Sequence, residues 1–412
     1  TFRKGDFGLV DLTSMTPSSY KGKGVDNFLV QAFYVPPDKK VVCQWSPAYL
    51  TPIPDEYGHY LFLKDQPLKE NGLLYDSWDN FRNDVPQDFI EYLHQLEEQN
   101  KKKFKGKLVP IFIGYQIAET SIHWQVALLE IGKFPIHGER ERKNGIKTDN
   151  WLGILDPGEI NWAITRDASY RFYFGRGALK TKLTNSKILI VGIGAVGSVL
   201  AKALTKGGCR RIDLADHDIK NPENVCRSEY FFTTGLGDKT YELTNILYTV
   251  SPFIRTSVFN NTCFQDVIKY FYDREPELES ELCDILNTYD IIFDCTTDDD
   301  LMFVLDSLQL ECDVINLSIT NHAKHLICGF YPNIYNFVRT QVEEILDQDT
   351  QDVYEPIGCW NPTFKASYTD INLAVQIAVK QIDTIYSNGT SKKNFVVNTH
   401  GNNGKCIHLQ EF

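Results

Sequence analysis

Three glycines at a fixed spacing are the residues of this sequence with the clearest chemical use. Gly192, Gly194 and Gly197 form the pattern G-x-G-x-x-G after the apolar run 188–191, and a helix-forming segment, 198–204, follows them. In this pattern the first glycine permits a tight turn, the second lets a phosphate approach the backbone, and the third lets the helix pack on the strand. Free amides and the helix dipole favour an anion there. The sequence therefore predicts a phosphate-binding turn between a buried strand and a helix.

An acidic residue follows at the distance expected of a ribose ligand. Asp216 ends the next strand-like run, 212–216, where a carboxylate can accept hydrogen bonds from ribose hydroxyls. NAD, FAD and ATP all carry phosphate and ribose. These residues therefore predict a nucleotide without identifying it.

The polar stretch behind Asp216 favours a triphosphate. It brings Asp218, Asn224, Arg227 and Lys239 toward the same strand ends. An NAD site has no need of two cations beside the pyrophosphate, whereas a triphosphate that loses pyrophosphate requires its developing negative charge to be neutralised. The cations Arg227 and Lys239 therefore favour ATP, with surface ion pairing as the alternative reading of each.

A second strand end carries several carboxylates. An apolar run ends in Asp294 and Asp298, and Asp299 and Asp300 stand behind them. The carboxyl edge of a parallel sheet is where acidic side chains hold a Mg²⁺ ion that bridges phosphates. For Asp299 or Asp300, a cap on the following helix is expected as readily as a metal contact.

These residues need a parallel α/β domain to position them. From residue 187 onward the order is strand, glycine turn, helix, strand, which is the order of a βαβ unit. The run 188–191 is continuously apolar, as in a strand buried on both faces. We expect an α/β fold whose second part, residues 166–412, is a Rossmann-like domain with a mostly parallel sheet.

The first part of the chain has a different pattern. One helix is expected over 86–102, and strand-like runs are separated by charged segments; these runs are 27–35, 107–115 and 121–131. We expect a separate mixed α/β N-terminal domain over residues 1–165. A polar stretch within 135–170 is expected to hold the linker.

Composition excludes several classes of protein. The 412 residues include 42 Lys and Arg against 54 Asp and Glu, a formal net charge of −12, which argues against a nucleic-acid partner. There is no run of 18 apolar residues and no layout of an export signal, so neither a membrane span nor secretion is expected. The ten cysteines contain no C-x-x-C, which argues against a zinc knuckle and favours a reducing, cytoplasmic location.

The ordered motifs resemble those of the adenylating superfamily of MoeB, ThiF and the ubiquitin-activating enzymes. The resemblance covers about residues 170–412. GIGAVG is similar to the family's glycine turn, and LADHDIKNPENVCRSE to its aspartate-x-aspartate, asparagine, arginine sequence. GDKTYELTNILYTVSP is similar to its lysine helix, and IIFDCTTDDD to its aspartate-cysteine-threonine-aspartate strand end. The resemblance implies that the second domain is an adenylation domain.

The resemblance also implies roles for individual residues. Five are implied to bind the nucleotide, through its ribose (Asp216) and around its phosphates (Asp218, Asn224, Arg227 and Lys239). Magnesium is implied to bind Asp298 or its neighbour, because the spelling DCTT places Thr297 where the family has its aspartate. The zinc-binding C-x-x-C pairs of the sulfur-carrier activators are missing, so no structural zinc is expected.

An arginine near the start of the second domain is implied as well. The family uses one from just before the first strand, often in the site of the partner subunit. Arg176 is the candidate here and Arg171 the second. A homodimer, or a pseudo-dimer with the N-terminal half, is therefore expected.

A long connection, 333–369, holds one cysteine, Cys359, within EPIGCWNPTFKAS. Long loops at strand ends are often functional, and a thiolate must be accessible to attack an acyl-adenylate. In the family this crossover loop covers the substrate tail and in several members carries a catalytic cysteine. The G-C-x-x-P-T-F spelling resembles that of bacterial ubiquitin-activating-like enzymes of antiphage defence operons, of the CBASS and Bil types. Cys359 is the predicted nucleophile, and a plain loop residue is the alternative.

Together these features predict an enzyme that activates a ubiquitin-like modifier. The modifier's C-terminal carboxylate would attack the α-phosphate of ATP, with Mg²⁺, Arg227, Lys239 and Arg176 stabilising the charge. The acyl group would pass to Cys359 and then to a conjugating-type enzyme, while the N-terminal domain serves docking or dimerisation. Two alternatives stay open: an enzyme that stops at the adenylate of a peptide or sulfur carrier, and an NAD-dependent oxidoreductase or degenerate binding module.

Overall fold

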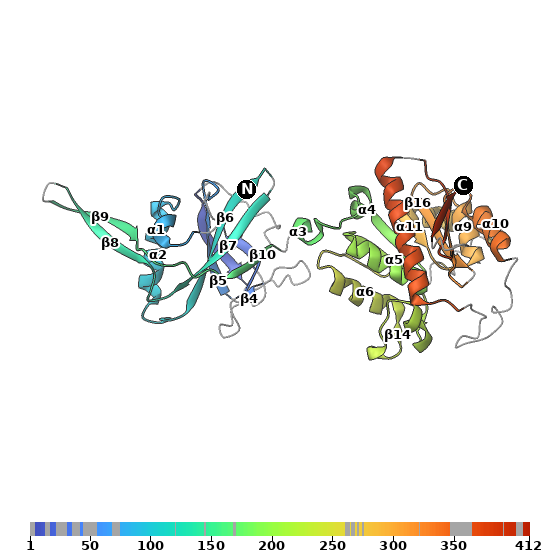
Figure 1. The fold of residues 1–412 in the computed structure, drawn as a ribbon, viewed down its shortest axis with the longest axis horizontal. Helices are drawn as coiled ribbons and strands as arrows, with labels where there is room; N and C mark the ends of the chain where they lie inside the picture. Colours follow the sequence, from blue (N-terminus) through green and yellow to red (C-terminus); the bar gives the residue numbers. More distant parts are fainter. Residues whose placement is uncertain are drawn as a thin grey trace. The chain divides into compact units, whose positions relative to one another are not determined.

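The computed structural model of the chain divides into two compact units, Thr1–Gly175 and Arg176–Phe412 (Figure 1). The structure describes residues 5–12, 17–21, 31–34, 42–43, 56–67, 75–119, 121–143, 146–167, 170–259, 264, 268–269, 272–273, 276–320, 322–346, 365–389, 391–400 and 407–412. No helix within these ranges is long and apolar enough to cross a membrane.

The first unit is built on a five-stranded sheet with the order β2-β1-β5-β6-β7. Helices α1 and α2 share one buried core with β6 and β7. The helix expected over 86–102 and the strands expected over 107–115 and 121–131 are confirmed as α2, β6 and β7. The bounds of these elements are β1 (Phe7–Leu12), β2 (Pro17–Lys21), β5 (Glu56–Phe62), α1 (Trp78–Phe81), α2 (Gln87–Asn100), β6 (Leu108–Ala118) and β7 (Ser121–Glu130).

The stretch 135–170, expected to hold the linker, contains strands in its described part. It holds β8 (Ile136–Lys143), β9 (Ile146–Leu155), β10 (Ile164–Asp167) and the first residue of α3 (Tyr170–Phe174). Ile136 of β8 lies opposite Leu155 of β9, and both side chains are buried in the core of the unit. The antiparallel pair β8–β9 satisfies its own backbone hydrogen bonds, which is why a charged, polar stretch can form strands. The position of the linker stays a prediction.

The predicted domain boundary, between residues 165 and 166, falls inside β10. This strand pairs with β3 (Gln31–Tyr34), which pairs in turn with β4 (Val42–Cys43). The division between the two compact units comes later, at Gly175. The docking or dimerisation role given to the N-terminal part stays a prediction.

The second unit contains a seven-stranded sheet with the order β12-β11-β15-β16-β17-β18-β19. β12, β11, β15 and β16 are mutually parallel, and each later neighbour is antiparallel. An extended segment at 255–258 adds parallel bridges on the outer side of β12. The strands are β11 (Lys187–Val191), β12 (Arg211–Ala215), β15 (Ile291–Asp294), β16 (Asp313–Thr320), β17 (His325–Phe330), β18 (Phe395–Asn398) and β19 (His408–Glu411).

The Rossmann-like arrangement is confirmed for one half of this sheet, but the mostly parallel sheet is wrong. Half of the pairings between its named strands are antiparallel. β16 and β17 are joined by residues 321–324 alone, and a parallel crossover needs a dozen residues or more. A short connection therefore forced the change of direction.

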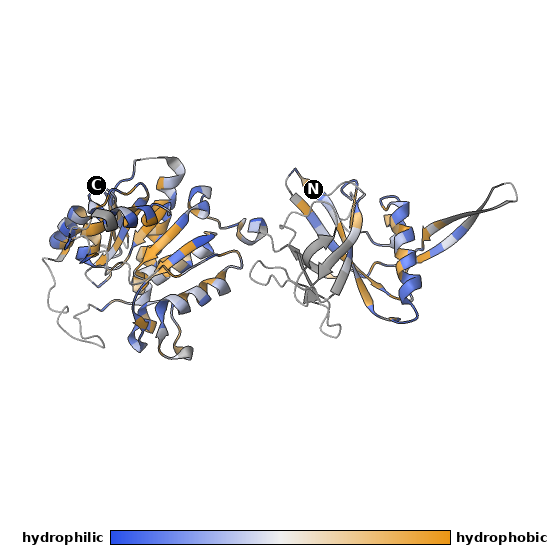
Figure 2. Cartoon of the chain, turned by 180° about the vertical axis from the view of Figure 1, so that it is seen from behind, coloured by the Kyte–Doolittle hydropathy of each residue, from blue (hydrophilic) through white to orange (hydrophobic). Residues whose placement is uncertain are grey.

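Helices cover both faces of this sheet. The side chains of β11 alternate between two cores: Ile188 and Ile190 pack with α5, α6 and α11, and Leu189 and Val191 pack with α8, α9 and α10. The expected burial of β11 on both faces is confirmed, and Figure 2 shows hydrophobic strands inside this unit. The helices are α4 (Thr181–Asn185), α5 (Ala195–Lys206), α6 (Lys239–Val250), α8 (Pro276–Leu286), α9 (Asp299–Ser307), α10 (Ile334–Leu346) and α11 (Tyr368–Asn388).

The expected long loop 333–369 begins as a helix. Ile334 and Val338 of α10 lie one turn apart and are buried in the second core, so this stretch has a packed apolar face. Residues 347–364, with Cys359, lie outside the described part of the chain.

The glycine turn is a place of very close backbone approach. Gly192 has φ +76°, and a Cβ there would lie 2.8 Å from the backbone of Thr296. A Cβ on Gly197 would lie 2.0 Å from the carbonyl oxygen of Gly192. The first and third glycines of the motif are therefore required for strand β15, the turn and helix α5 to pack together.

This packing gives a first prediction. Gly197→Ala should lower the free energy of unfolding by about 3 kcal/mol, the upper end of the cost of overpacking, because the methyl group meets fixed backbone. Chemical denaturation followed by circular dichroism measures this. Gly177→Ala is the control, because a Cβ at Gly177 meets no atom within 4 Å. Equal stability of the two variants would contradict the packing role of Gly197.

Candidate active site

A cavity of about 470 Å³ opens at the carboxyl ends of β11 and β15. The chain continues from β11 to β12 on one side of the sheet and later to β15 on the other, so the cavity lies where the strand order reverses. Open α/β sheets bind their ligands at this switch point. Seven residues predicted for the site line this switch-point cavity: Gly192, Gly194, Asp216, Asp218, Arg227, Lys239 and Asp298.

Asp216 braces the glycine turn. Its Oδ2 accepts a 2.9 Å hydrogen bond from the backbone N–H of Ile193, and its Oδ1 accepts one of 2.9 Å from the N–H of Asp218. A carboxylate has about four acceptor positions, so these bonds leave room for ribose hydroxyls. Asp216 therefore shapes the glycine turn, whereas the sequence predicts it only as a ligand of the ribose.

Gly194 differs from the other two glycines of the motif. It is the N-cap residue of α5, and a Cβ built on it would meet no atom within 4 Å. Because packing does not require this glycine, its missing side chain keeps the helix N-terminus open to the cavity. The N-terminus of a helix favours an anion.

The two predicted cations are held differently. Lys239 is buried and forms a 2.9 Å ion pair with Asp218. Burial alone would raise the pKa of the Asp218 carboxyl, but the hydrogen bond and charge of Lys239 outweigh it and hold that pKa below its ordinary value. The Arg227 guanidinium makes no hydrogen bond or ion pair with any residue that the structure describes. Arg227 is therefore the cation of the cavity that is free for a ligand.

The segment that carries Arg227 is anchored directly to the glycine turn. Arg227 ends the 3₁₀ helix η2 (Pro222–Arg227), and the buried Tyr230 follows it. The Tyr230 hydroxyl donates a 2.6 Å hydrogen bond to the carbonyl oxygen of Ile193. This bond couples the position of the arginine to that of the phosphate-binding turn.

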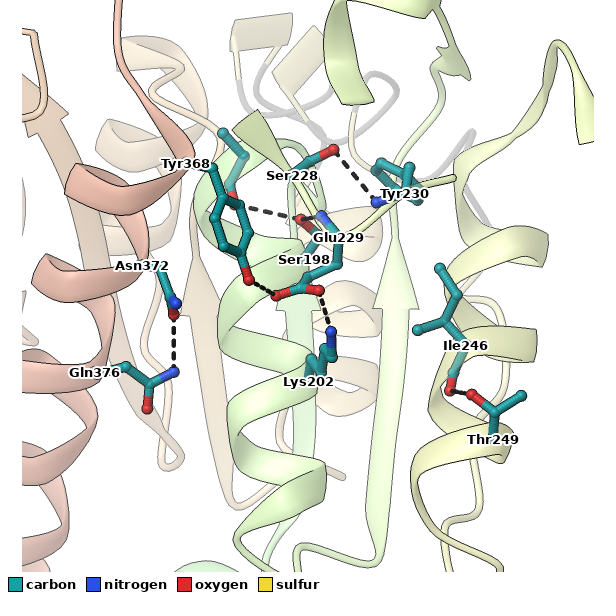
Figure 3. Close-up of polar contacts among 11 residues, drawn as sticks. Ser198, Lys202, Ser228, Glu229, Tyr230, Ile246, Thr249, Tyr368, Asn372 and Gln376 are labelled. Atoms are coloured by element: carbon teal, nitrogen blue, oxygen red, sulfur yellow. Dashed lines mark hydrogen bonds and ion pairs between the residues drawn. The ribbon is translucent and has the colours of Figure 1, made fainter. Parts of the chain in front are cut away.

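A buried carboxylate, Glu229, anchors the same segment to two helices. Figure 3 shows its side chain between Lys202 of α5, with which it forms an ion pair, and Tyr368 of α11, whose hydroxyl donates a 2.7 Å hydrogen bond. The Glu229 backbone N–H donates to the Ser198 hydroxyl at 3.2 Å. The bond to Glu229, with burial, raises the pKa of Tyr368 to about 12, so the hydroxyl stays a donor at neutral pH.

Asn224, also predicted to bind phosphate, does not line the switch-point cavity. Its Oδ1 accepts a 2.9 Å hydrogen bond from the backbone N–H of Asn221, which closes the first turn of η2. The structure thus gives Asn224 a role in shaping the turn that carries Arg227. Direct contact between Asn224 and a phosphate stays a prediction.

The acidic strand end is ordered by hydrogen bonds. Asp294 is buried and accepts from the Thr296 N–H, the Thr296 hydroxyl at 2.7 Å and the Asn316 amide at 2.9 Å. Desolvation raises the pKa of Asp294 against these bonds. Thr297 then adopts φ +59°, a rare conformation for a β-branched residue. Asp294 therefore fixes the turn, and Thr296, Thr297 and Asp298 line the cavity.

Asp298 is the residue that caps α9, a role expected of Asp299 or Asp300. Its Oδ1 accepts a 3.0 Å hydrogen bond from the backbone N–H of Leu301. Its Oδ2 makes no hydrogen bond to a described residue. Carboxylate oxygens are ligands that Mg²⁺ prefers, so this oxygen could coordinate the ion. Asp298 therefore fits both readings, cap and metal ligand.

A second group of possible metal ligands consists of Asp216, His217 and Asp218. One ligand atom from each of Asp216, His217 and Asp218 lies within 4.8 Å of the others, which is close enough to share an ion. Two carboxylates and one imidazole suit a divalent cation, although Asp218 is already paired with Lys239. Sequence reasoning missed His217, whose signal was its place between the two predicted aspartates.

Three predicted residues are not brought into the site by the described structure. Arg176 is exposed and does not line the switch-point cavity of its own unit. Arg171 belongs to α3 in the first unit, and Cys359 lies outside the described residues. An apolar wall that includes Phe264 and Ile268 was not foreseen, because those residues lie far along the chain in a stretch without regular periodicity.

The fold and this site define an α/β nucleotide-binding domain of the Rossmann kind. Residues 167–314 match the model of the ThiF family. The predicted resemblance to the superfamily of MoeB, ThiF and the ubiquitin-activating enzymes is thereby confirmed.

Several curated proteins are similar to this chain. The ATP-dependent ubiquitin transferase-like protein Cap2 of Enterobacter hormaechei subsp. hoffmannii is 25% identical over 238 residues, which cover 55% of this chain and 37% of Cap2. The adenylyltransferase and sulfurtransferase UBA4 of Scheffersomyces stipitis is 26% identical, over 33% of this chain and 28% of the relative. The tRNA threonylcarbamoyladenosine dehydratase of Bacillus subtilis is 29% identical, over 35% and 46%.

The chain thus spans less than half the length of each of these relatives. Among solved structures, E. coli MccB with selenomethionine MccA is similar at 18% identity and a TM-score of 0.38, over 56% of this chain and 65% of that one.

The anchoring of the Arg227 segment gives a second prediction. Tyr230→Phe removes only the hydroxyl that bonds Ile193, so the free energy of unfolding should fall by about 1 kcal/mol. Amide hydrogen exchange at Ile193 and Gly194 should speed up as well. The control is Tyr241→Phe, because Tyr241 is 67% exposed. Unchanged exchange in Tyr230→Phe would show that the turn is held without this bond.

Proposed function

We propose that this chain uses ATP to adenylate the C-terminal carboxylate of a ubiquitin-like protein. One observation carries the proposal: at the switch-point cavity, the glycine turn and Asp216 meet two cations, Arg227 and Lys239. A hydride-transfer site would not need both cations, whereas the displacement of pyrophosphate does.

Different residues of the switch-point cavity would bind the phosphate, the ribose and the base of the nucleotide. The N-terminus of α5 at Gly194 would receive a phosphate, Asp216 the ribose, and the apolar wall at Phe264 and Ile268 the base. Asp298 would offer a carboxylate oxygen to magnesium, and the group Asp216, His217 and Asp218 is the alternative position for the ion. Bound there, magnesium would neutralise phosphate charge.

The reaction needs a cation that can bind the phosphate oxygens while negative charge develops on the leaving pyrophosphate. A carboxylate oxygen of the substrate bonds to the α-phosphorus, the bond from that phosphorus to its bridging oxygen breaks, and pyrophosphate leaves with the electron pair. Arg227 has no described partner, so it can bind the phosphate oxygens without first breaking an ion pair. Lys239 is held rigidly by Asp218 and adds a fixed positive charge.

The comparisons support this reaction class. The relative named Cap2 is described as ATP-dependent and ubiquitin transferase-like, and UBA4 as an adenylyltransferase. A modifier protein, a conjugating-type partner, a cytoplasmic location and a homodimer completed by Arg176 are part of the proposal. In such a homodimer, the exposed Arg176 would serve the site of the partner copy.

The thioester step needs a cysteine whose thiolate can form and reach the acyl-adenylate. Cys295 is the described cysteine that lines the switch-point cavity, but burial and the charge of Asp294 raise its pKa well above 9. A thiol that stays protonated is a poor nucleophile. We therefore retain Cys359 as the acceptor of the acyl group. If Cys359 does not react, the enzyme stops at the adenylate, which is the alternative reaction.

The adenylation proposal predicts the effect of removing Lys239. Lys239→Ala should reduce modifier-dependent ATP–pyrophosphate exchange at least a hundredfold, by the loss of one charge that stabilises the transition state. The fold should persist, because Asp218 is half exposed and can turn to water. Lys380→Ala, on the exposed side of α11, is the control. Tight NAD(H) binding without ATP affinity would exclude the proposal.

The thioester step has its own test. Cys359→Ala should keep ATP–pyrophosphate exchange and lose the thiol-sensitive adduct with the modifier on a non-reducing gel. Cys283→Ala is the control, because Cys283 of α8 is partly exposed and lines neither described cavity. Cys226→Ala is measured as well, because Cys226 is exposed and directly precedes Arg227. Loss of the adduct in Cys226→Ala alone would reassign the nucleophile. If the wild type forms no adduct, the reaction ends at the adenylate.

A further inference from the structure

A second cavity adjoins the switch-point cavity. Its volume is about 440 Å³, and the two cavities share Arg227 and Ala366 in their walls. It lies between η2, the turn at 322–324 and the start of α11. We call it the basic cavity, after Arg227, His322, Lys324, Lys365 and His400 in its lining.

The basic cavity carries positive charge that the protein does not use. The Lys324 ammonium and the Arg227 guanidinium form no hydrogen bond or ion pair with any described residue. The lining also contains two acidic residues, Glu223 and Asp370, so its basic residues outnumber its acidic ones. Two uncommitted cations in one cavity are unexpected in a chain with a formal net charge of −12.

The neighbouring imidazole of His325 responds to this charge. Burial lowers its pKa, and the nearby side chains of Lys324 and His400 lower it further. The walls that carry the charges are held in place. His322 and Ala323 both have φ near +60°, the His322 Nδ1 lies 2.8 Å from the Lys365 carbonyl oxygen, and the Thr399 N–H donates to the Lys324 carbonyl oxygen at 2.8 Å.

We propose that the basic cavity binds acidic side chains close to the C-terminus of the substrate protein. This inference rests on the proposed function, which places the substrate carboxylate in the switch-point cavity. The substrate residues that precede this carboxylate must pass along the wall of the switch-point cavity. Arg227 lines both cavities, so the basic cavity lies next to that wall. An extended chain advances about 3.3–3.6 Å per residue, so side chains two to four residues from the end reach a neighbouring cavity. The substrate class is therefore a protein with an acidic C-terminal tail.

Synthetic hexapeptides test this inference. They end in Gly-Gly with a free carboxylate and carry Glu, Gln or Lys at the third and fourth positions from the end. Peptide-dependent ATP–pyrophosphate exchange and fluorescence anisotropy with a nonhydrolysable ATP analogue give their kcat/KM and Kd. With the wild type, the Glu peptide should exceed the Lys peptide at least tenfold.

A charge reversal is the decisive variant. Lys324→Glu should invert the order of the peptides, because it replaces an uncommitted cation by an anion. Its affinity for the ATP analogue should not change, since Lys324 does not line the switch-point cavity. Lys380→Glu, an exposed lysine outside both cavities, should keep the wild-type order.

The outcomes separate the inference from the proposed function. Equal use of the Glu and Lys peptides, binding of none of them, or an unchanged order in Lys324→Glu would overturn the inference while ATP binding stands. An unchanged order with weaker inhibition by pyrophosphate would assign the cavity to the leaving group and also overturn it. A wild type that does not bind the ATP analogue would overturn the proposed function itself.

Discussion

The close approach of three backbone segments is the constraint on which the rest of the site depends. Gly192 directly follows strand β11, Gly197 in the first turn of helix α5 packs against the Gly192 carbonyl oxygen, and the turn after β15 passes Gly192 at Thr296. Any side chain at the two glycines would separate these segments. Their contact brings the helix N-terminus, the carboxylate of Asp216 and the acidic turn after Asp294 to one cavity. The chemistry of the site follows from this contact.

Buried polar groups then place the charges around that turn. Glu229 and Tyr230 bind α5, α11 and the glycine turn, so the segment that follows Arg227 is anchored. Arg227 emerges from this anchored segment with its guanidinium uncommitted. The protein thus combines a rigid support with a cation that no described acid neutralises. Such pre-organisation favours a transition state, because charge is stabilised without rearrangement of the support.

The two cavities show how charge is divided in an acidic protein. Lys239 is buried and paired with Asp218, whereas Arg227 and Lys324 form no ion pair with a described acid. A net charge of −12 repels anions over long range. Local cations therefore have to attract the anionic ligands. The segments 227–230 and 322–324 hold Arg227 and Lys324 in the cavities.

The βαβ unit and its glycine turn could be predicted from the residues alone, because spacing along one strand–turn–helix unit is a local property. The other predicted residues of the switch-point cavity were found because they follow the carboxyl ends of predicted strands. The sequence by itself did not determine the β8–β9 hairpin, the antiparallel half of the sheet or helix α10, since strand pairing depends on partners far along the chain. Only the tertiary structure showed that Asn224 shapes η2, that Asp298 caps α9, and that Lys324 and Arg227 share a cavity. Asn224 and Asp298 each bond to a backbone N–H three residues away, but the choice between that bond and a ligand depends on where the segment lies in the fold. Arg227 and Lys324 lie far apart in the sequence, and only the packing of η2 near the turn at 322–324 places them in one cavity.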